Sequence, residues 1–286
     1  MYFVGLDLAW GERNRSGIAV LDAGGDLVFA DAAVSDAGIQ AALTPYVDGP
    51  CLVAIDAPLV VNNPRGMRPA ERELNRHFQP FHAGAQPAHQ GMDWFKNSPR
   101  GARIAESLGL EMDPYSTAPR RAIEVYPHPA TVALFRLGRT LKYKSRGGRS
   151  VETRRSAMLE LMRLIEGLAF APQRMRVTGS DHWAQLRRNV EQAQRQVDLD
   201  RAEDPIDAVV WAYIALYATR RPDDITIYGD FANGYILTPT TAEGSQTHTA
   251  KSGTGRQHPG APALGRTNGA VLLCCRRYKR HGECGR

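Results

Sequence analysis

Four acidic residues lie in apolar segments, where a lone carboxylate is costly. Asp7 interrupts VGLDLAW, Asp56 ends CLVAID, Glu124 is the acid of AIEVY, and Asp207 precedes AVVWAY. Burying an ionised carboxylate without a partner costs several kcal/mol, and no Lys or Arg lies within three residues of Asp56 or Asp207. Mg²⁺ and Mn²⁺ prefer carboxylate oxygens as ligands. The four acids therefore predict a site for one of these metals.

Two of these acids have a simpler explanation when each is taken alone. Asp207 is the third residue after Asp204, with Pro205 between them, so it could complement the dipole of a helix that begins there. Glu124 could pair with Arg120 or Arg121. Asp7 and Asp56 have no comparable alternative, so the prediction depends on the four acids as a set.

The elements around these acids predict a mixed α/β sheet. Alternating or apolar segments indicate strands at 2–9, 17–22, 26–34, 51–56 and 122–126, with Gly24 and Gly25 in a tight turn between the second and third. A helix over 36–43, closed before Pro45, follows the first three strands. This order predicts a three-strand antiparallel meander plus parallel strands, flanked by helices, with the fourth strand parallel to the first.

An insertion is expected after the fourth strand, over about residues 60–121. It contains seven prolines and one clear helix, 69–78, and it should cover the acidic end of the sheet. Beyond it, Pro127 and Pro129 open a helix, and apolar periodicity predicts further helices over 151–168, 183–197 and 206–218. A last extended segment, 228–237, closes a domain of residues 1–241.

Basic residues near this domain's expected site are candidates for substrate binding. Arg68 and Glu71 share one helix face at i,i+3 and could pair with each other or reach a phosphate. Lys142 and Lys144, with Arg146 and Arg149, flank two glycines in a loop that could contact a nucleic-acid backbone. Exposed surface without a role is the alternative in both cases. The spacing of the histidines at 77, 82 and 89 fits no compact metal motif.

Charge and cysteine content separate the domain from residues 242–286. The segment 242–286 has eight Lys/Arg and two Asp/Glu, whereas 1–241 has 28 of each sign, so the net charge of +6 belongs to the C-terminal segment. Its Gly, Ser, Thr and Pro content predicts disorder, either as a basic arm for nucleic acid or as an extension without a role. Cys51 is the only cysteine of residues 1–241, and no secretory signal or membrane span is recognisable, so a cytoplasmic location is expected.

The segments VGLDLAW, SGIAVLD, LVAIDAPL, IEVYPHPA and EDPIDAVVWAY together resemble the predicted RNase H-fold nuclease family catalogued as domain of unknown function 429. The resemblance runs over residues 1–241 with the motifs in the expected order. It implies an RNase H-like sheet with acids on strand one, strand four and the last helix. By motif, these acids are Asp7, Asp56 and Asp207, with Glu124 as a fourth.

The function expected from these features is metal-dependent phosphodiester hydrolysis with Mg²⁺ or Mn²⁺. In a two-metal mechanism the ions lie about 4 Å apart, and Asp7 would bridge them. One alternative is a non-catalytic nucleic-acid or protein-binding module that kept the fold. The other is an actin-like-fold phosphotransferase, which would require a duplicated domain and a second glycine-rich loop that the sequence does not show. Nucleic acid is the expected partner, no membrane association is expected, and the sequence does not indicate an oligomeric state.

Overall fold

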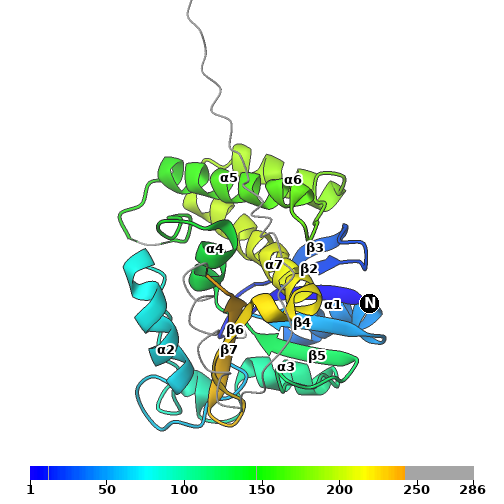
Figure 1. Ribbon diagram of the computed structural model, residues 1–286. Coiled ribbons are helices and arrows are strands. Elements are labelled where there is room, and N and C mark those ends of the chain that lie inside the picture. The colour runs from blue at the N-terminus through cyan, green and yellow to red at the C-terminus, as the bar shows by residue number, and fades with distance from the viewer. Residues whose placement is uncertain (12, 146, 242–286) are drawn as a thin grey trace, which may run out of the picture. The chain divides into compact units, whose positions relative to one another are not determined.

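A mixed β-sheet lies at the centre of the fold (Figure 1). The computed structural model describes residues 1–11, 13–145 and 147–241, and within them the central sheet has five strands in the order β3-β2-β1-β4-β5. β1 is antiparallel to β2, and β2 to β3, whereas β4 is parallel to both β1 and β5. This confirms the predicted α/β class and meander, an arrangement consistent with an RNase H-like fold. The strand bounds are β1 Tyr2–Asp7, β2 Ser16–Leu21, β3 Leu27–Ala33, β4 Cys51–Ile55 and β5 Arg120–Glu124.

Helices cover the sheet, which explains why its central strands are apolar throughout. α7, Gln196–Arg220, packs across β1, β2 and β4. α1, Asp36–Val47, joins β3 to β4 and buries three aliphatic side chains in the core. α5, Val151–Gly167, and α6, Asp181–Glu191, pack together and against α7. β1 is buried from Phe3 to Asp7, as expected for a strand with both faces covered.

Two glycines allow α7 to approach the sheet closely. A Cβ atom on Gly5 would lie 1.9 Å from the carbonyl oxygen of Ala208, and one on Gly17 would lie 2.0 Å from that of Asp204. Neither position could carry a side chain without moving the helix. Because alternate side chains of a strand share a face, Gly5 and Asp7 point to the same side of β1, so α7 lies on the face that Asp7 occupies.

The insertion between β4 and β5 is more helical than the sequence indicated. The predicted helix is present as α2, Pro69–Phe78, and a second helix, α3, covers Arg100–Ser107. The 3-10 helices η1, Gln79–Phe81, and η2, Asp93–Phe95, lie between them. α4, Pro127–Phe135, begins at the expected prolines. The predicted final segment is a hairpin of β6, Ile225–Asp230, and β7, Gly234–Pro239, which packs against α2.

Several predicted helix ends were wrong. α1 continues through Pro45 to Val47, because a proline in the last turn of a helix removes only one intrahelical hydrogen bond. α7 begins at Gln196 and includes Pro205, which is buried, so packing against the sheet outweighs the missing N–H. The apolar stripe expected to form one helix over 183–197 is divided between α6 and α7. η3, Leu168–Phe170, and η4, Pro222–Asp224, complete the helical elements of the described residues.

Some predictions concern residues outside this description. The expected disorder of 242–286 and the possible roles of its cysteines lie outside the described residues, and so does Arg146. Within the described part of the chain, no helix has the length and apolar character required to cross a bilayer.

Candidate active site

Two carboxylates lie side by side at the C-terminal ends of β1 and β4. Asp7 is the last residue of β1, and Asp56 directly follows β4. The parallel register pairs Leu6 with Ile55, and the Asp56 N–H donates to the Leu6 carbonyl oxygen at 2.9 Å. Burial raises the pKa of Asp7; burial and the Asp7 charge hold the pKa of Asp56 well above its usual value. The structure thus brings together the two acids that had no alternative explanation.

α7 adds three acids to this end of the sheet. Glu203, Asp204 and Asp207 lie at i, i+1 and i+4, which places them on one side of the helix. Asp207 is fully buried in the middle of α7, far from the first turn, so helix-dipole stabilisation does not explain it. Burial and the Asp7 charge raise the pKa of Asp204 to about 8. Burial raises the pKa of Asp207 to about 6 although Lys144 opposes the shift.

Lys144 places a positive charge among these acids. Its Nζ atom contacts Asp207 Oδ2, lies 3.4 Å from Glu203 Oε1 and lies 3.9 Å from Asp7 Oδ2. Burial disfavours the ammonium ion, but the surrounding carboxylates hold the pKa of Lys144 well above its usual value. The neighbouring Tyr143 hydroxyl donates to Asp207 Oδ1 at 2.9 Å. The predicted basic loop therefore contributes Lys144 to the acidic site itself.

Buried Arg154 holds the Lys144 loop against α7. From α5, its Nε–H donates to the Tyr143 carbonyl oxygen at 3.0 Å, and its Nη2 donates to Glu203 Oε2 at 2.8 Å. Its Nη1 donates to the Gln196 side chain at 2.6 Å, at the start of α7. One guanidinium group thus connects the loop, α5 and α7. This arrangement fixes the backbone directly before Lys144.

We call Asp7, Asp56, Glu203, Asp204 and Asp207 the acidic group. Asp7, Glu203 and Asp207 contact Lys144, and the charge of Asp7 raises the pKa values of Asp56 and Asp204. Every acid of the group has a raised pKa, for which burial is the largest cause. Because Arg154 also pairs with Glu203, Lys144 and Arg154 together face five carboxylates, so further positive charge would stabilise the ionised forms of the acids. Their oxygens are the donor type that Mg²⁺ and Mn²⁺ prefer. Among the described residues, however, no three metal-ligating side chains are already arranged around a common ion position.

Glu124 lies apart from Lys144, in a buried ion-pair network. Its Oε1 accepts from Arg68 Nη2 at 2.6 Å; its Oε2 accepts from Arg68 Nη1 at 3.0 Å and from the Leu59 N–H at 2.9 Å. Glu124 pairs neither with Arg120 nor with Arg121, whose guanidinium groups donate to backbone carbonyl oxygens. Both carboxylate oxygens are thus engaged. To serve as the expected fourth metal ligand, Glu124 would have to give up some of these bonds.

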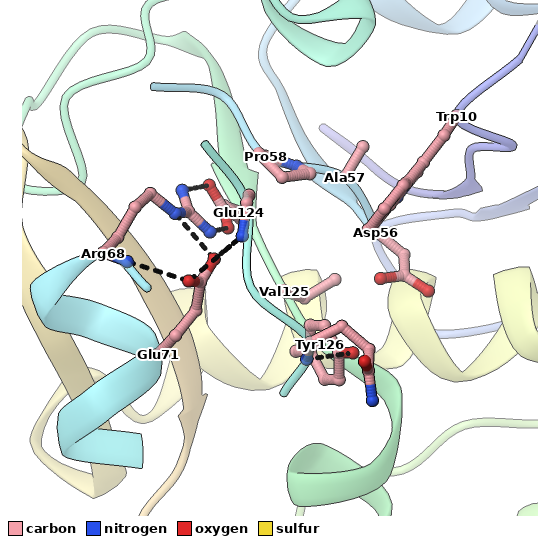
Figure 2. Close-up of a pocket in the computed structure, with 11 residues that line it drawn as sticks. Trp10, Asp56, Ala57, Pro58, Arg68, Glu71, Glu124, Val125 and Tyr126 are labelled. Carbon is pink, nitrogen blue, oxygen red and sulfur yellow. Dashed lines mark hydrogen bonds and ion pairs between the residues drawn. The ribbon is translucent and has the colours of Figure 1, made fainter. Parts of the chain in front are cut away.

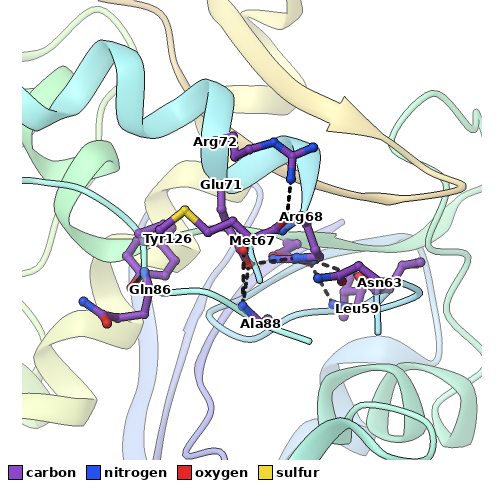
Figure 3. Close-up of polar contacts among 12 residues, drawn as sticks. Leu59, Asn63, Met67, Arg68, Glu71, Arg72, Gln86, Ala88 and Tyr126 are labelled. Carbon is purple, nitrogen blue, oxygen red and sulfur yellow. Dashed lines mark hydrogen bonds and ion pairs between the residues drawn. The ribbon is translucent and has the colours of Figure 1, made fainter. Parts of the chain in front are cut away.

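Arg68 and Glu71 pair as one of their two sequence interpretations proposed. Arg68 Nε donates to Glu71 Oε1 at 2.9 Å, and the backbone N–H of Arg68 donates to Glu71 Oε2 at 2.9 Å, at the start of α2 (Figure 3). Glu71 also accepts from the Ala88 N–H. Both side chains are 1% exposed. The pair joins the insertion to β5 through Glu124, and a phosphate could reach Arg68 only if this network opened.

A small pocket connects the two groups (Figure 2). Asp56 and Trp10 line one side, and Arg68, Glu71 and Glu124 line the other. The insertion therefore lies at the rim of the acidic site, where the sequence placed it. Asp56, which lines this pocket, is partly exposed, unlike Asp207.

The remaining candidates lie outside the acidic group. Lys142 is exposed, and Arg149 donates through Nη1 to the Lys144 carbonyl oxygen at 2.8 Å. The His77 ring bonds to the Tyr228 hydroxyl at 2.9 Å. His82 has a positive φ of 56° at the end of η1. These contacts stabilise loops and helix ends.

Sequence reasoning missed Glu203 and Asp204 as members of the acidic group. The motif EDPID contains both together with Asp207 at helical spacing. Pro205 hid this signal because a proline is expected in the first turn of a helix, which suggested that α7 began there. Had the helix been extended upstream through the proline, the spacing would have placed all three acids on one side.

Comparison with known proteins supports a single assignment. Neither the search of curated proteins nor the search of solved structures gave a match. The family model described as protein of unknown function DUF429 matches residues 5–232, which include Asp7, Asp56 and Asp207. The chain therefore belongs to the domain of unknown function 429 family.

Proposed function

We propose that this protein is a metal-dependent phosphodiesterase that acts on nucleic acid. The observation that carries the proposal is the acidic group, in which three of five neighbouring carboxylates lie within 3.9 Å of Lys144 Nζ and all five have raised pKa values. A divalent cation would neutralise this excess charge, and carboxylate oxygens would be its ligands. Perturbed titratable groups beside a pocket are typical of functional sites.

Asp7, Asp56, Asp204 and Asp207 would hold Mg²⁺ or Mn²⁺. The bound metal would supply Lewis-acid stabilisation of a phosphoryl oxygen and an activated water. Lys144 would have to withdraw from Asp207, which would free its ammonium group to pair with a phosphate oxygen. Tyr143 would continue to donate to Asp207 and so orient that carboxylate. Glu124, with Arg68, would hold the insertion at the rim of the pocket.

A cleavage assay distinguishes a nuclease from a non-catalytic binding module that kept the fold. Cleavage of a mixed panel of single-stranded, duplex and junction DNA and RNA should be measured with Mn²⁺ or Mg²⁺. Wild type should cleave at least one substrate, and Asp7→Asn should not. Asp48→Asn, which changes an exposed acid at the end of α1, should behave as wild type and is the matched control.

Calorimetric titration of Mn²⁺ separates the remaining outcomes. Metal binding without cleavage of any substrate would contradict the nuclease proposal and leave a metal site. Cleavage by Asp7→Asn at the wild-type rate would exclude the acidic group as the catalytic centre. A cytoplasmic location belongs to the same proposal, and its support is that Cys51 is the one cysteine in the described residues, where it is free and buried.

A further inference from the structure

Two tryptophans lie beside the acidic group without a role in the chemistry proposed above. Trp10 follows Asp7 by three residues and lines the same pocket as Asp56 (Figure 2). Its ring makes edge contacts with Trp94, at 5.9 Å between centroids, and with Phe95, at 5.3 Å. Phe95 is buried, but Trp94 is 50% exposed. An aromatic surface therefore continues from the pocket to solvent.

The backbone on both sides of Trp10 is fixed by buried Arg100. From α3, Arg100 Nη1 donates to the carbonyl oxygens of Ala9, at 2.6 Å, and Gly11, at 3.1 Å. Its Nε donates to Asp36 at 2.8 Å, which neutralises the guanidinium charge. Trp10 is thus held between two carbonyl groups that bind the same side chain. A rigid aromatic side chain loses little conformational entropy when a ligand binds, so it suits recognition.

The chemistry around this surface favours a flat ring attached to a phosphate. Exposed tryptophan faces stack nucleobases with little dependence on base identity. Arg13 and Arg15, which follow in the β1–β2 connection, are exposed cations that suit a phosphate backbone. A base can stack on a side chain only when its own face is free, as in a single strand.

We propose that Trp10 and Trp94 form a stacking surface for an unpaired nucleobase next to the phosphodiester bond. This inference rests on the proposed function and specifies its substrate class as single-stranded nucleic acid. Of these two rings, Trp10 lines the pocket with Asp56, and Trp94 extends the surface outward. A protein partner that docks on the same aromatic residues is the competing occupant.

Tryptophan fluorescence can test the stacking surface, because Trp183 and Trp211 are 2% and 0% exposed. Quenching by a bound base thus reports Trp10 and Trp94. The two probes are hexathymidylate and a backbone of equal length and charge that lacks bases, each titrated in Ca²⁺. Wild type should bind hexathymidylate more tightly than the base-free backbone, by about tenfold for each base that stacks.

Variants identify the residue responsible. Trp94→Ala should weaken hexathymidylate binding about tenfold and leave binding of the base-free backbone unchanged. Trp94→Phe should restore most of the loss. Phe170→Ala removes an aromatic side chain that is 87% exposed in η3 and should change neither affinity. Melting curves of each variant show whether the fold is intact.

Other results would overturn the inference. Equal affinity of wild type for the two probes, or no binding of either, would favour a protein-docking surface. Duplex binding as tight as single-strand binding would exclude the proposed substrate class. Cleavage is scored separately in Mn²⁺, so cleavage with base-independent binding would remove the stacking surface but retain the nuclease proposal. Base-selective binding without cleavage would retain the stacking surface but remove the nuclease proposal.

Discussion

Replacement of Asp7 by asparagine tests whether the acidic group binds metal or only supports the fold. The substitution keeps the side-chain size and removes one charge from neighbours whose pKa values are already raised by burial and repulsion. Without metal, the free energy of unfolding should stay the same or increase. If the main role of Asp7 were to pair with Lys144, 3.9 Å away, its loss should instead decrease that free energy.

The expected effect of metal can be given a magnitude. A ligand at about 100 times its Kd that binds the folded state alone stabilises that state by about 2.7 kcal/mol. For a domain of this size, each kcal/mol changes Tm by about 2–4 °C. Wild type should therefore gain about 5–10 °C in excess Mn²⁺. Asp7→Asn should gain little, because a ligand between Asp56 and the α7 acids is lost.

The assay compares melting curves of three proteins with and without Mn²⁺. These are wild type, Asp7→Asn and the exposed control Asp48→Asn, which should gain as much as wild type. Equal metal-induced shifts in wild type and Asp7→Asn would refute the reasoning, because Asp7 would then contribute nothing to the metal site. A large loss of stability in metal-free Asp7→Asn would point to a structural carboxylate.

Three further predictions follow from the same site. The metal-free protein should lose stability as pH rises from about 4 to about 8, because folding raises the pKa of Asp204 from 3.8 to about 8 and that of Asp207 to about 6. The folded state therefore favours the protonated forms of these acids. Urea titrations across this pH range would measure the loss, and a rise in stability would contradict the prediction. Calorimetry should show that Lys144→Met binds Mn²⁺ at least about tenfold more tightly than wild type, because the substitution removes a competing positive charge within about 4 Å of the acids. The same variant should cleave more slowly than wild type. Weaker Mn²⁺ binding would exclude the competition between Lys144 and the metal. Glu124→Gln should reduce the free energy of unfolding by about 3–5 kcal/mol, because it breaks a buried ion pair with Arg68, and it should leave Mn²⁺ affinity unchanged. A loss of Mn²⁺ affinity with unchanged stability would instead show that Glu124 is a metal ligand.

The sheet and the pairing of Asp7 with Asp56 could be predicted because the signals are local. A turn with two glycines specifies the hairpin of β2 and β3, and the apolar run of CLVAID specifies a buried strand that ends in Asp56. In a parallel pair, equivalent strand ends lie at one edge of the sheet, so Asp7 and Asp56 had to meet there. No tertiary contact had to be known for this step.

The partners of the acids could not be predicted, because they are set by tertiary contacts. Arg68 lies 56 residues from Glu124 in the chain, and its pairing depends on how the insertion folds back on β5. Lys144 lies 63 residues before Asp207, in a loop whose position is set by the contacts that Arg154, on α5, makes with the loop and with α7. Spacing along the chain contains no record of either approach.

The position of α7 connects the family motifs to the acidic group. Gly5 lies two residues before Asp7 in β1, and Gly17, in the neighbouring strand β2, pairs with Asp7. The backbone carbonyl groups of Ala208 and Asp204 in α7 approach Gly5 and Gly17 so closely that neither glycine could carry a Cβ atom. A side chain at either position would push α7 away from the sheet and would carry Asp207 away from Asp7 with it. The glycines of GLD and SGI are therefore part of the site's geometry, because they set how closely the acids of the helix approach those of the strands.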